Sequence, residues 1–373
     1  MRKKIITFAI IVLFALGIIY LLKYVQVAQS NVQKKDVLQT KSPIVGMANL
    51  GDAVVVGTNE GKVIVLDTKG NVLWQTKIDS SIFDIAGDTK KGTIVVAGVN
   101  FYLFYKSGKQ IFKKGFKNYI GVKGKCLSNG NIELLYQSLS NLSYIAVTTD
   151  KTGKTLFEEK IPDLGESSQI DISPDGELLF AGERGELYLI DKDGVEAHTL
   201  LKVSTSNLHS IYAYFIGNKI VAGYKIDTQK NPEIPVFFYS KDFKNVSELL
   251  LHNNINNIFL QNDDIVFATE NKFIMFNEDG KEISRMQKLG FSPFSFSSGS
   301  DSKLYLYMKS SDSSEQNKKN IYYLSVVKNN TEIVKYVFSS GFTPVVSLSK
   351  KSDITFIVNN NKLTIVNLIG AKK

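Results

Sequence analysis

One short phrase recurs along this chain and constrains its fold more than any other feature. Its first copy runs from Gly61 to Gln75 and combines an alternating apolar run, a turn of the form Asp67-x-x-Gly70 and a second run that carries Trp74. Asp favours such a turn because its side chain hydrogen-bonds to the following backbone, and glycine tolerates positive φ. The phrase therefore predicts two strands joined by a tight turn.

The same type of turn returns along the rest of the chain, each time after a short apolar run. Successive turns are 38 to 50 residues apart, the length of a four-stranded propeller blade. Strand-like runs such as 53–56 and 93–97 are frequent after residue 23, whereas helical periodicity is not evident there. The turns fall at Gly70, Gly108, Gly153, Asp191 to Gly194, residues 240–243, Gly280, residues 328–330 and Gly370.

The ends of the chain indicate how such a ring closes. The last copy lacks a fourth strand, whereas residues 35–41 resemble the fourth strand at 71–77 and precede the first complete unit. We therefore expect residues 35–373 to form an all-β, eight-bladed propeller. Residues 35–41 would complete its last blade and remove two exposed sheet edges. Seven blades is the alternative, if a degenerate unit near 240 or 330 merges with its neighbour.

The N-terminal segment has the composition of a membrane anchor. Residues 1–4 carry three positive charges, and residues 5–22 contain nothing more polar than Thr and Tyr. Eighteen helical residues at ~1.5 Å each nearly cross a ~30 Å hydrocarbon layer. The positive flank favours a cytoplasmic tail at 1–4, a single transmembrane helix at 5–23, a linker at 24–34 and an extracytoplasmic propeller on the cell membrane. A cleaved signal peptide is the alternative.

Composition narrows the functional classes. Cys126 is the single cysteine, which excludes an intrachain disulfide framework and a cysteine-rich metal site. The formal net charge is +9, but the cations are almost all lysines. Arginine is the residue whose forked donors usually read phosphates and bases. Nucleic-acid binding is therefore not expected.

The phrase from Leu66 to Trp74 resembles the repeat of the quinoprotein-type (PQQ-like) eight-bladed propellers, and residues 172–181 resemble a strand turn of WD40-like propellers. The resemblance covers most of residues 40–373 as a fold, and it implies that a fourth-strand aromatic docks on the adjacent blade. The non-enzymatic outer-membrane assembly propeller is similar in role, and membrane-anchored propellers of Gram-positive bacteria are similar in layout.

No catalytic, cofactor-binding or metal-binding constellation is visible. Quinoprotein enzymes add a calcium-held cofactor, a catalytic Asp and commonly a vicinal disulfide, which a chain with one cysteine cannot form. His209 and His252 lack partners at metal-site spacing, and His198 occupies the aromatic position of the repeat. We therefore expect a non-enzyme without a cofactor.

Charged residues of one sign are grouped in two stretches of the sequence, which we call the basic sector and the acidic sector. Residues 89–132 hold nine lysines and no acid, whereas residues 154–200 hold twelve acids against four bases. Solvated outer strands would explain both sectors. In a functional interpretation, the basic sector meets an anionic envelope polymer or the acidic face of a partner. The candidate interaction patch consists of Lys106, Lys109, Lys113, Lys114, Lys117, Lys123 and Lys125.

Two long polar segments, residues 224–235 and 309–320, are expected between the second and third strands of their blades. They would project from one face, and propellers commonly bind partners through such loops. The sequence thus predicts a non-catalytic docking scaffold for an envelope protein or an anionic envelope polymer. A ligand-binding or sensory propeller for a small molecule or glycan is the alternative, and a degenerate quinoprotein-like enzyme is a remote one.

Overall fold

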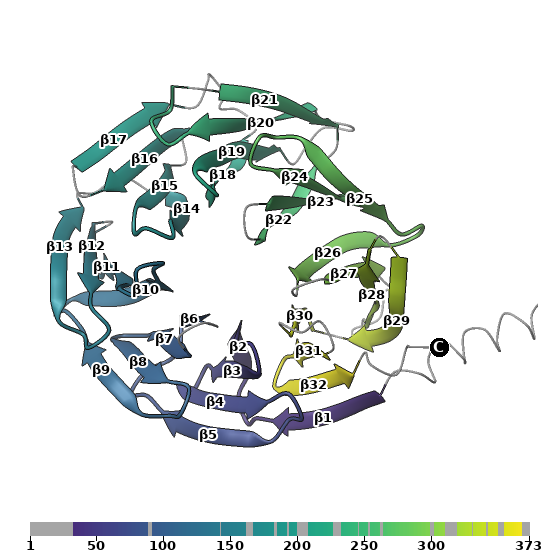
Figure 1. The fold of residues 1–373 in the computed structure, drawn as a ribbon, viewed down its shortest axis with the longest axis horizontal. Helices are drawn as coiled ribbons and strands as arrows, with labels where there is room; N and C mark the ends of the chain where they lie inside the picture. The colour runs from purple at the N-terminus through teal and green to yellow at the C-terminus, as the bar shows by residue number, and fades with distance from the viewer. Residues whose placement is uncertain are drawn as a thin grey trace, which may run out of the picture.

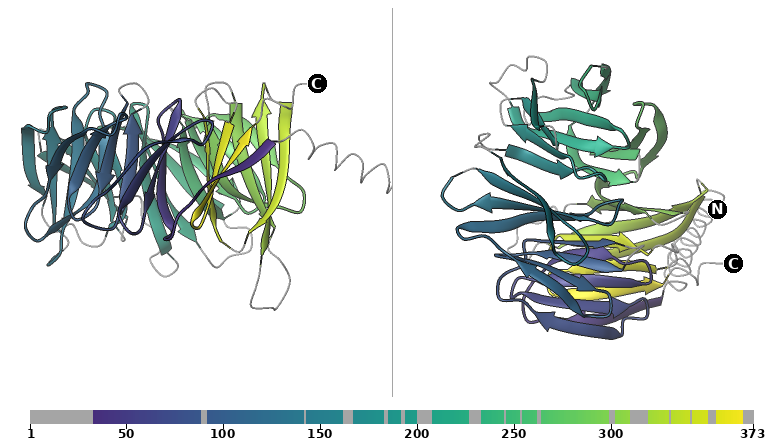
Figure 2. Two further views of the ribbon diagram at one scale, coloured as in Figure 1. Left: turned by 90° about the horizontal axis from the view of Figure 1, so that it is seen from below. Right: turned by 60° about the vertical axis from the view of Figure 1, so that its left-hand side comes forward.

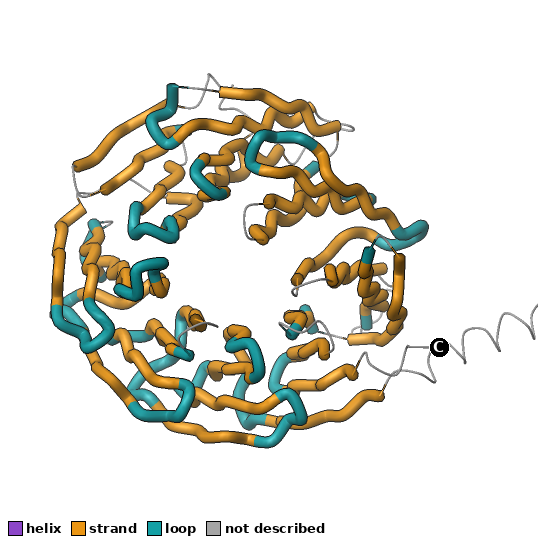
Figure 3. Tube along the Cα trace, viewed as in Figure 1, coloured by secondary structure: helices purple, strands orange, loops and turns teal. Residues whose placement is uncertain are grey.

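The computed structural model of the protein is a ring of eight four-stranded antiparallel sheets arranged around a central axis (Figure 1). The described part of the chain consists of strands and their connections, with no helix long and apolar enough to cross a membrane (Figure 3). The segment expected to span the membrane, residues 5–23, lies outside the described residues. The structure describes residues 33–88, 92–141, 143–161, 167–182, 185–191, 194–199, 208–226, 233–244, 246–252, 254–261, 264–298, 302–309, 319–329, 331–340, 342–349 and 354–367.

The first four blades follow the chain in order, each from its innermost to its outermost strand. Blade 1 contains β2 (Ile44–Asn49), β3 (Ala53–Thr58), β4 (Lys62–Asp67) and β5 (Val72–Lys77). Blade 2 contains β6 (Asp84–Asp88), β7 (Thr93–Ala97), β8 (Phe101–Tyr105) and β9 (Gln110–Lys114). Blade 3 contains β10 (Tyr119–Cys126), β11 (Ile132–Ser138), β12 (Tyr144–Thr149) and β13 (Thr155–Ile161). Blade 4 contains β14 (Ser167–Ile172), β15 (Leu178–Gly182), β16 (Glu186–Asp191) and β17 (Gly194–Thr199).

The next three blades repeat this order, and the eighth takes its outermost strand from the N-terminal end. Blade 5 contains β18 (Leu208–Ile216), β19 (Lys219–Ile226), β20 (Glu233–Ser240) and β21 (Val246–His252). Blade 6 contains β22 (Ile255–Gln261), β23 (Asp264–Thr269), β24 (Lys272–Asn277) and β25 (Glu282–Gln287). Blade 7 contains β26 (Ser292–Ser298), β27 (Ser302–Lys309), β28 (Asn320–Lys328) and β29 (Thr331–Ser340). Blade 8 contains β30 (Pro344–Leu348), β31 (Ile354–Asn359), β32 (Lys362–Asn367) and β1 (Gln33–Gln39).

Strand β1 closes the ring. It pairs antiparallel with β32, from Gln33 opposite Asn367 to Gln39 opposite Lys362. Asp36 anchors the pairing, because its carboxylate lies 2.6 Å from Lys362 Nζ and accepts a hydrogen bond from Thr364 Oγ1 at 2.7 Å. The strand that the sequence placed at 35–41 thus belongs to the last blade, and the count of eight blades is confirmed over the alternative of seven.

Burial explains why the repeats form these sheets. The two central strands of a blade pack against both neighbouring blades, so they are apolar nearly throughout, as in β3 and β4. The outermost strand alternates between exposed and half-buried residues, as in β5. The aromatics Phe237 to Tyr239 and Tyr322 to Tyr323 are all buried.

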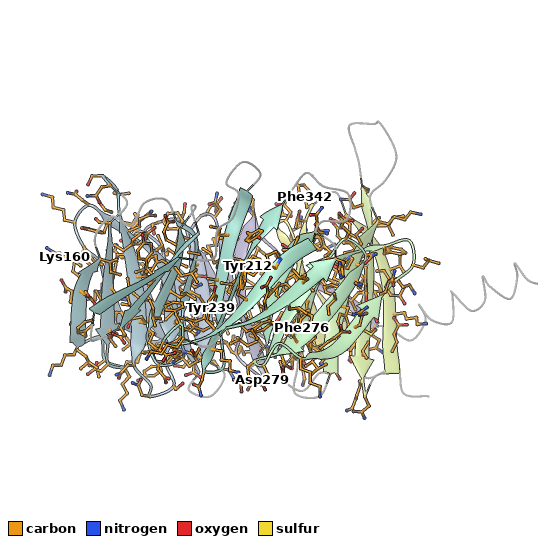
Figure 4. The ribbon with its side chains drawn as sticks, turned by 90° about the horizontal axis from the view of Figure 1, so that it is seen from above. Lys160, Tyr212, Tyr239, Phe276, Asp279 and Phe342 are labelled. Carbon is orange, nitrogen blue, oxygen red and sulfur yellow. The ribbon has the colours of Figure 1, made fainter. Side chains whose placement is uncertain are left out.

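The ring has two faces that differ in the connections they carry. We call the turn face the one with the connections between strands one and two and between strands three and four of each blade. The loop face carries the connections between strands two and three and those between successive blades. Figure 2 shows the ring edge-on, and in Figure 4 Asp279, in a turn of the turn face, and Phe342, in a connection of the loop face, lie on opposite sides.

Candidate functional site

The repeated turn is a structural device on the turn face. Asp67 Oδ1 accepts hydrogen bonds from the backbone N–H groups of Lys69 and Asn71, both at 2.8 Å, which holds the first turn closed. Trp74 then reaches the next blade, where its Nε1 donates to the carbonyl of Lys106 at 2.5 Å. A Cβ on Gly108, which has φ of +91°, would lie 3.0 Å from the Trp74 ring.

Other blades repeat this contact between an aromatic or aliphatic side chain and the turn glycine of the following blade. Phe112 lies where a Cβ on Gly153 would approach within 2.6 Å, and Phe238 stands in the same relation to Gly280 at 3.0 Å. Asp191 pairs with Gly194 in the blade 4 hairpin. All eight residues assigned to the repeat therefore lie at the turn-face ends of their blades: Asp67, Gly70, Trp74, Gly108, Gly153, Asp191, Gly194 and Gly280.

The structure distributes the seven lysines of the candidate patch over three places. Lys106 and Lys109 lie in the β8–β9 turn on the turn face, where Lys106 forms an ion pair with Asp52 of blade 1. Lys117 lies in the β9–β10 connection on the loop face. These two groups are on opposite faces, so they do not form one surface.

Lys113 and Lys114 end strand β9 toward the loop face. Lys113 Nζ lies 2.5 Å from Asp79 Oδ2 and 5.6 Å from the centre of the Tyr102 ring. The hydrogen bond from Lys113 lowers the pKa of Asp79, and the same bond raises the pKa of Lys113. Lys114 Nζ donates to Thr155 Oγ1 of blade 3 at 2.6 Å. Both lysines thus stabilise contacts beside the loop face while retaining exposed surface.

Lys123 and Lys125 lie on β10, the innermost strand of blade 3, and tie it to blade 4. Lys123 Nζ donates to the carbonyl of Ile170 at 2.6 Å and lies 3.5 Å from Asp171 Oδ1, and Lys125 Nζ donates to the carbonyl of Ile172. Burial lowers the pKa of Lys125. These two lysines therefore bridge blades rather than join the surface lysines.

The loop face exposes large apolar side chains in its connections. Among the described residues, five such side chains belong to these connections and none to the turns of the turn face. Leu289 is 92% exposed and Leu139 is 67% exposed. Single exposed apolar residues are normal on any protein, so the asymmetry between the two faces is the informative observation. The five are Phe83, Val99, Leu139, Leu289 and Phe342.

Three of these side chains lie in neighbouring connections of blades 1 to 3, which hydrogen bonds link to one another. The Phe83 N–H donates to the carbonyl of Ala97 at 2.8 Å, and the Val99 N–H donates to Ser80 Oγ at 3.0 Å. The Leu139 N–H donates to the carbonyl of Asn118 at 2.9 Å, next to Lys117. We call Phe83, Val99 and Leu139 the apolar sector.

The long segments at 224–235 and 309–320 also connect second and third strands, as expected. They join β19 to β20 and β27 to β28, so their ends lie at the loop face. Their central parts, residues 227–232 and 310–318, lie outside the described residues.

A cavity of about 370 Å³ lies between blades 3 and 4, toward the turn face. Five carboxylate side chains line it, together with apolar side chains that include Leu156 and Phe157. Lys241 of blade 5 lies 2.5 Å from one of these carboxylates, Glu177, and 4.0 Å from another, Asp175. The five carboxylates belong to Glu133, Glu159, Asp175, Glu177 and Asp191.

Among these five carboxylates, Glu133 is the one that lies outside the acidic sector of the sequence, residues 154–200. Its side chain is only 2% exposed, and its Oε2 accepts a hydrogen bond from Thr148 Oγ1 at 2.6 Å. Burial raises the pKa of Glu133 to about 7, against the smaller opposing effect of the Thr148 hydrogen bond. A glutamate inside an apolar strand run, Ile132-Glu-Leu-Leu-Tyr136, is the signal that could have identified it.

A metal centre is not among the sites. Within the described ranges, no three His, Cys, Asp or Glu side chains are grouped to hold an ion. His252 ends strand β21, whereas the side chains of His198 and His209 are outside the described part of the structure.

Comparisons with known proteins identify the fold but no family. No protein-family model matches the sequence, and no curated protein matches it either. Among solved structures, the C-terminal WD40 domain of Sif2 superposes with a TM-score of 0.60 at 9% identity, over 90% of this chain and 98% of that one. The Dos1 propeller gives 0.59 at 11% identity, over 90% and 94% of the two chains. The computationally designed Ika8 protein gives 0.56 at 12% identity, over 89% and 98%.

The fold is an eight-bladed β-propeller, and it is similar to the folds of these WD40 and other propellers. At such low identity these likenesses show the fold alone and carry no partner or activity to this chain. The more specific likeness to PQQ-like repeats stays a prediction.

Proposed function

We propose that this protein is a non-catalytic docking scaffold that binds a partner protein through the apolar sector of its loop face. The single observation that carries the proposal is the difference between the connections of the two faces. The loop face exposes Phe83, Val99 and Leu139, whereas the described turns of the opposite face expose polar and charged side chains. Apolar groups at the centre of a contact usually supply most of the binding energy.

Lysines near this sector indicate the charge of the partner. Lys113, Lys114 and Lys117 lie beside it, and the pairing of Lys113 with Asp79 leaves the positive charge of the other two in excess locally. A rim of this sign favours a partner with acidic residues around an apolar contact, and it accelerates their encounter. Three lysines of the candidate interaction patch thus remain part of the proposed site, beside the apolar sector.

The scaffold role fits the rigidity of the ring. Each blade packs on its neighbours, so the apolar sector is held by three successive blades. We infer no enzymatic activity and no cofactor.

Membrane attachment belongs to the same proposal. Strand β1 starts at Gln33, at the turn-face end of the outer rim, because Gln33 pairs with the last residue of β32. An anchor at residues 5–23, joined through the linker, would approach the ring from that side. The loop face would then point away from the membrane, toward partners in the envelope.

The test is affinity capture of the full-length chain from its own membranes after crosslinking in cells. The Phe83→Ser, Val99→Ser, Leu139→Ser variant should lose a captured protein that the native chain retains. The matched control is Tyr105→Ser with Leu260→Ser, two side chains that are each 39% exposed at strand ends near the turn face. The control should capture the same protein as the native chain. Equal capture by both variants would overturn the proposal.

A further inference from the structure

We propose that the cavity between blades 3 and 4 binds an aliphatic diamine or polyamine. This site is separate from the apolar sector, because it opens between blades near the turn face rather than on the loop face. It therefore goes beyond docking, and neither binding function requires the other.

The cavity arises from a change in one row of the repeat. In blade 1, Val55, Val65 and Trp74 lie opposite one another on successive strands and pack against blade 2. The corresponding row of blade 3 begins with Glu133 and Thr148. A glutamate and a threonine thus replace two valines at the place where a blade normally packs on its neighbour.

The residues at the position of Glu133 in the neighbouring blades show how unusual a glutamate is there. Blade 2 has Val95 there, and blade 4 has Leu179. Both side chains are at most 1% exposed. A buried carboxylate at such a position costs stability, and exceptions of this kind concentrate at functional sites.

The third member of the row leaves the cavity open. Phe157 lies opposite Thr148 and lines the cavity, but it is 40% exposed, whereas Trp74 is half-buried against Phe104 and the Gly108 turn. The blade 3 aromatic is therefore available at the rim. An aromatic face beside carboxylates is suited to contact with an ammonium group.

The charge of Glu133 has no cationic partner among the described residues. Its one described hydrogen bond is the donation from Thr148, whose hydroxyl is neutral. Across the cavity, a Cβ on Gly176 would lie 3.7 Å from Glu133 Oε2, so the blade 4 turn passes close to that carboxylate at a position that has no side chain. A buried, uncompensated carboxylate facing an open cavity is suited to receive a positive group from a ligand.

The other lining groups define the class of that ligand. Lys241 pairs with Glu177, and the described residues that line the cavity include no cationic side chain. The carboxylates are not grouped to hold a metal ion in the described part of the chain, and apolar side chains such as Leu178 and Ile190 line the cavity with them. Several carboxylates on a partly apolar lining complement a molecule that carries more than one ammonium group on a hydrocarbon chain. The volume of about 370 Å³ is within the usual range for a small-molecule site.

The experiment is isothermal titration of the full-length chain in detergent with 1,4-diaminobutane and with spermidine. Butylamine, which has one ammonium group, and Mg²⁺ are the control ligands. The native chain should bind the diamine or spermidine saturably, and Glu133→Gln should weaken binding by at least about tenfold, because it removes one charged hydrogen bond. Glu158→Gln is the matched control, since Glu158 is the exposed neighbour on β13 that does not line the cavity.

Thermal unfolding of both variants establishes that they remain folded. Absence of saturable diamine and spermidine binding by the native chain would overturn the proposal, as would equal affinity in Glu133→Gln. Equal affinity for butylamine or for Mg²⁺ would overturn the ligand class. None of these results depends on the docking partner, so a failure here leaves the proposed scaffold role standing.

Discussion

The turn face and the loop face of the ring are built from the same repeat, yet their side chains serve different purposes. On the turn face, Trp74 packs into the turn that contains Gly108, and ion pairs such as Lys219 with Asp279 connect neighbouring blades. On the loop face, Phe83 and Leu139 contact solvent even though their backbones are held by hydrogen bonds.

The difference shows at which positions the repeat constrains the type of residue and at which positions it does not. Turn-face positions must fit the adjacent blade, so their residue types follow from packing. The exposed side chains of the loop-face connections, such as Phe83 and Leu139, have no such requirement. A stability measurement should therefore respond to the turn face, and a binding measurement should respond to the loop face.

The largest expected loss of stability is for Trp74→Ala. It removes the ring from the Phe104 and Gly108 contacts and leaves the carbonyl of Lys106 without its indole donor. We expect the free energy of unfolding to fall by about 3–5 kcal/mol, measured by chemical denaturation. Phe83→Ala, on the loop face, should change it by less than about 1 kcal/mol. Similar losses for both would contradict the contrast between the faces.

Glu133→Val should stabilise the turn face rather than destabilise it, because it gives blade 3 the valine that blade 1 has at the same position. The folded-state pKa of Glu133 is about 7, above the ordinary value of 4.5. The folded chain therefore holds this proton more tightly, and native stability should fall as pH rises from about 4.5 to 7, by at most about 3 kcal/mol. The valine variant should lack this component and be more stable than the native chain at pH 8.

The measurement is thermal unfolding of both proteins between pH 5 and pH 8. The other titratable groups near the cavity are the same in both chains, so the difference between the two curves isolates Glu133. A difference that does not grow with pH would contradict the burial of an uncompensated carboxylate. The other groups are Glu159, Asp175, Glu177, Asp191 and Lys241.

Ion pairs provide a smaller test on both faces. Lys113→Ala breaks the exposed pair with Asp79 on the loop-face side, and Lys106→Ala breaks the pair with Asp52 on the turn face. Each change should reduce stability only slightly at low salt and by less at high salt. A large loss for either one would show that the pair supports the ring rather than its surface.

The smallest stability effect is expected for Leu289→Ser combined with Phe342→Ser. Both side chains are exposed in connections of the loop face. Their replacement should change the free energy of unfolding by less than about 0.5 kcal/mol, measured by the same denaturation. A clear destabilisation would mean that the loop face also supports the packing of the ring.

Much of the fold followed from the sequence because the repeat encodes it locally. The Asp67-x-x-Gly70 turn and its copies gave the blade period, and the match between 35–41 and the first fourth strand indicated the closing strand, observed as Gln33–Gln39. Each of these signals depends on neighbours in the chain, such as a turn or an alternating strand.

The candidate sites were harder to predict from the sequence, because each depends on residues that are neighbours in space but distant in the chain. The run of lysines from Lys106 to Lys125 is continuous in sequence, but a blade folds back on itself and sends the ends of its strands to both faces. The cavity at Glu133 requires the alignment of two blades, and the apolar sector requires three. A comparison of Glu133 with Val55 and Val95 in successive repeats would have flagged the exception.

The most direct measurement is site-specific photocrosslinking in cells from a probe placed at Phe83, Leu139 or Tyr105 of the full-length chain. The first two positions lie in the apolar sector, and Tyr105 ends β8 near the turn face. We expect one protein to crosslink from both loop-face positions and not from Tyr105. Crosslinks to that protein from Tyr105 alone, or no crosslinked protein from either loop-face position, would contradict docking through the loop face.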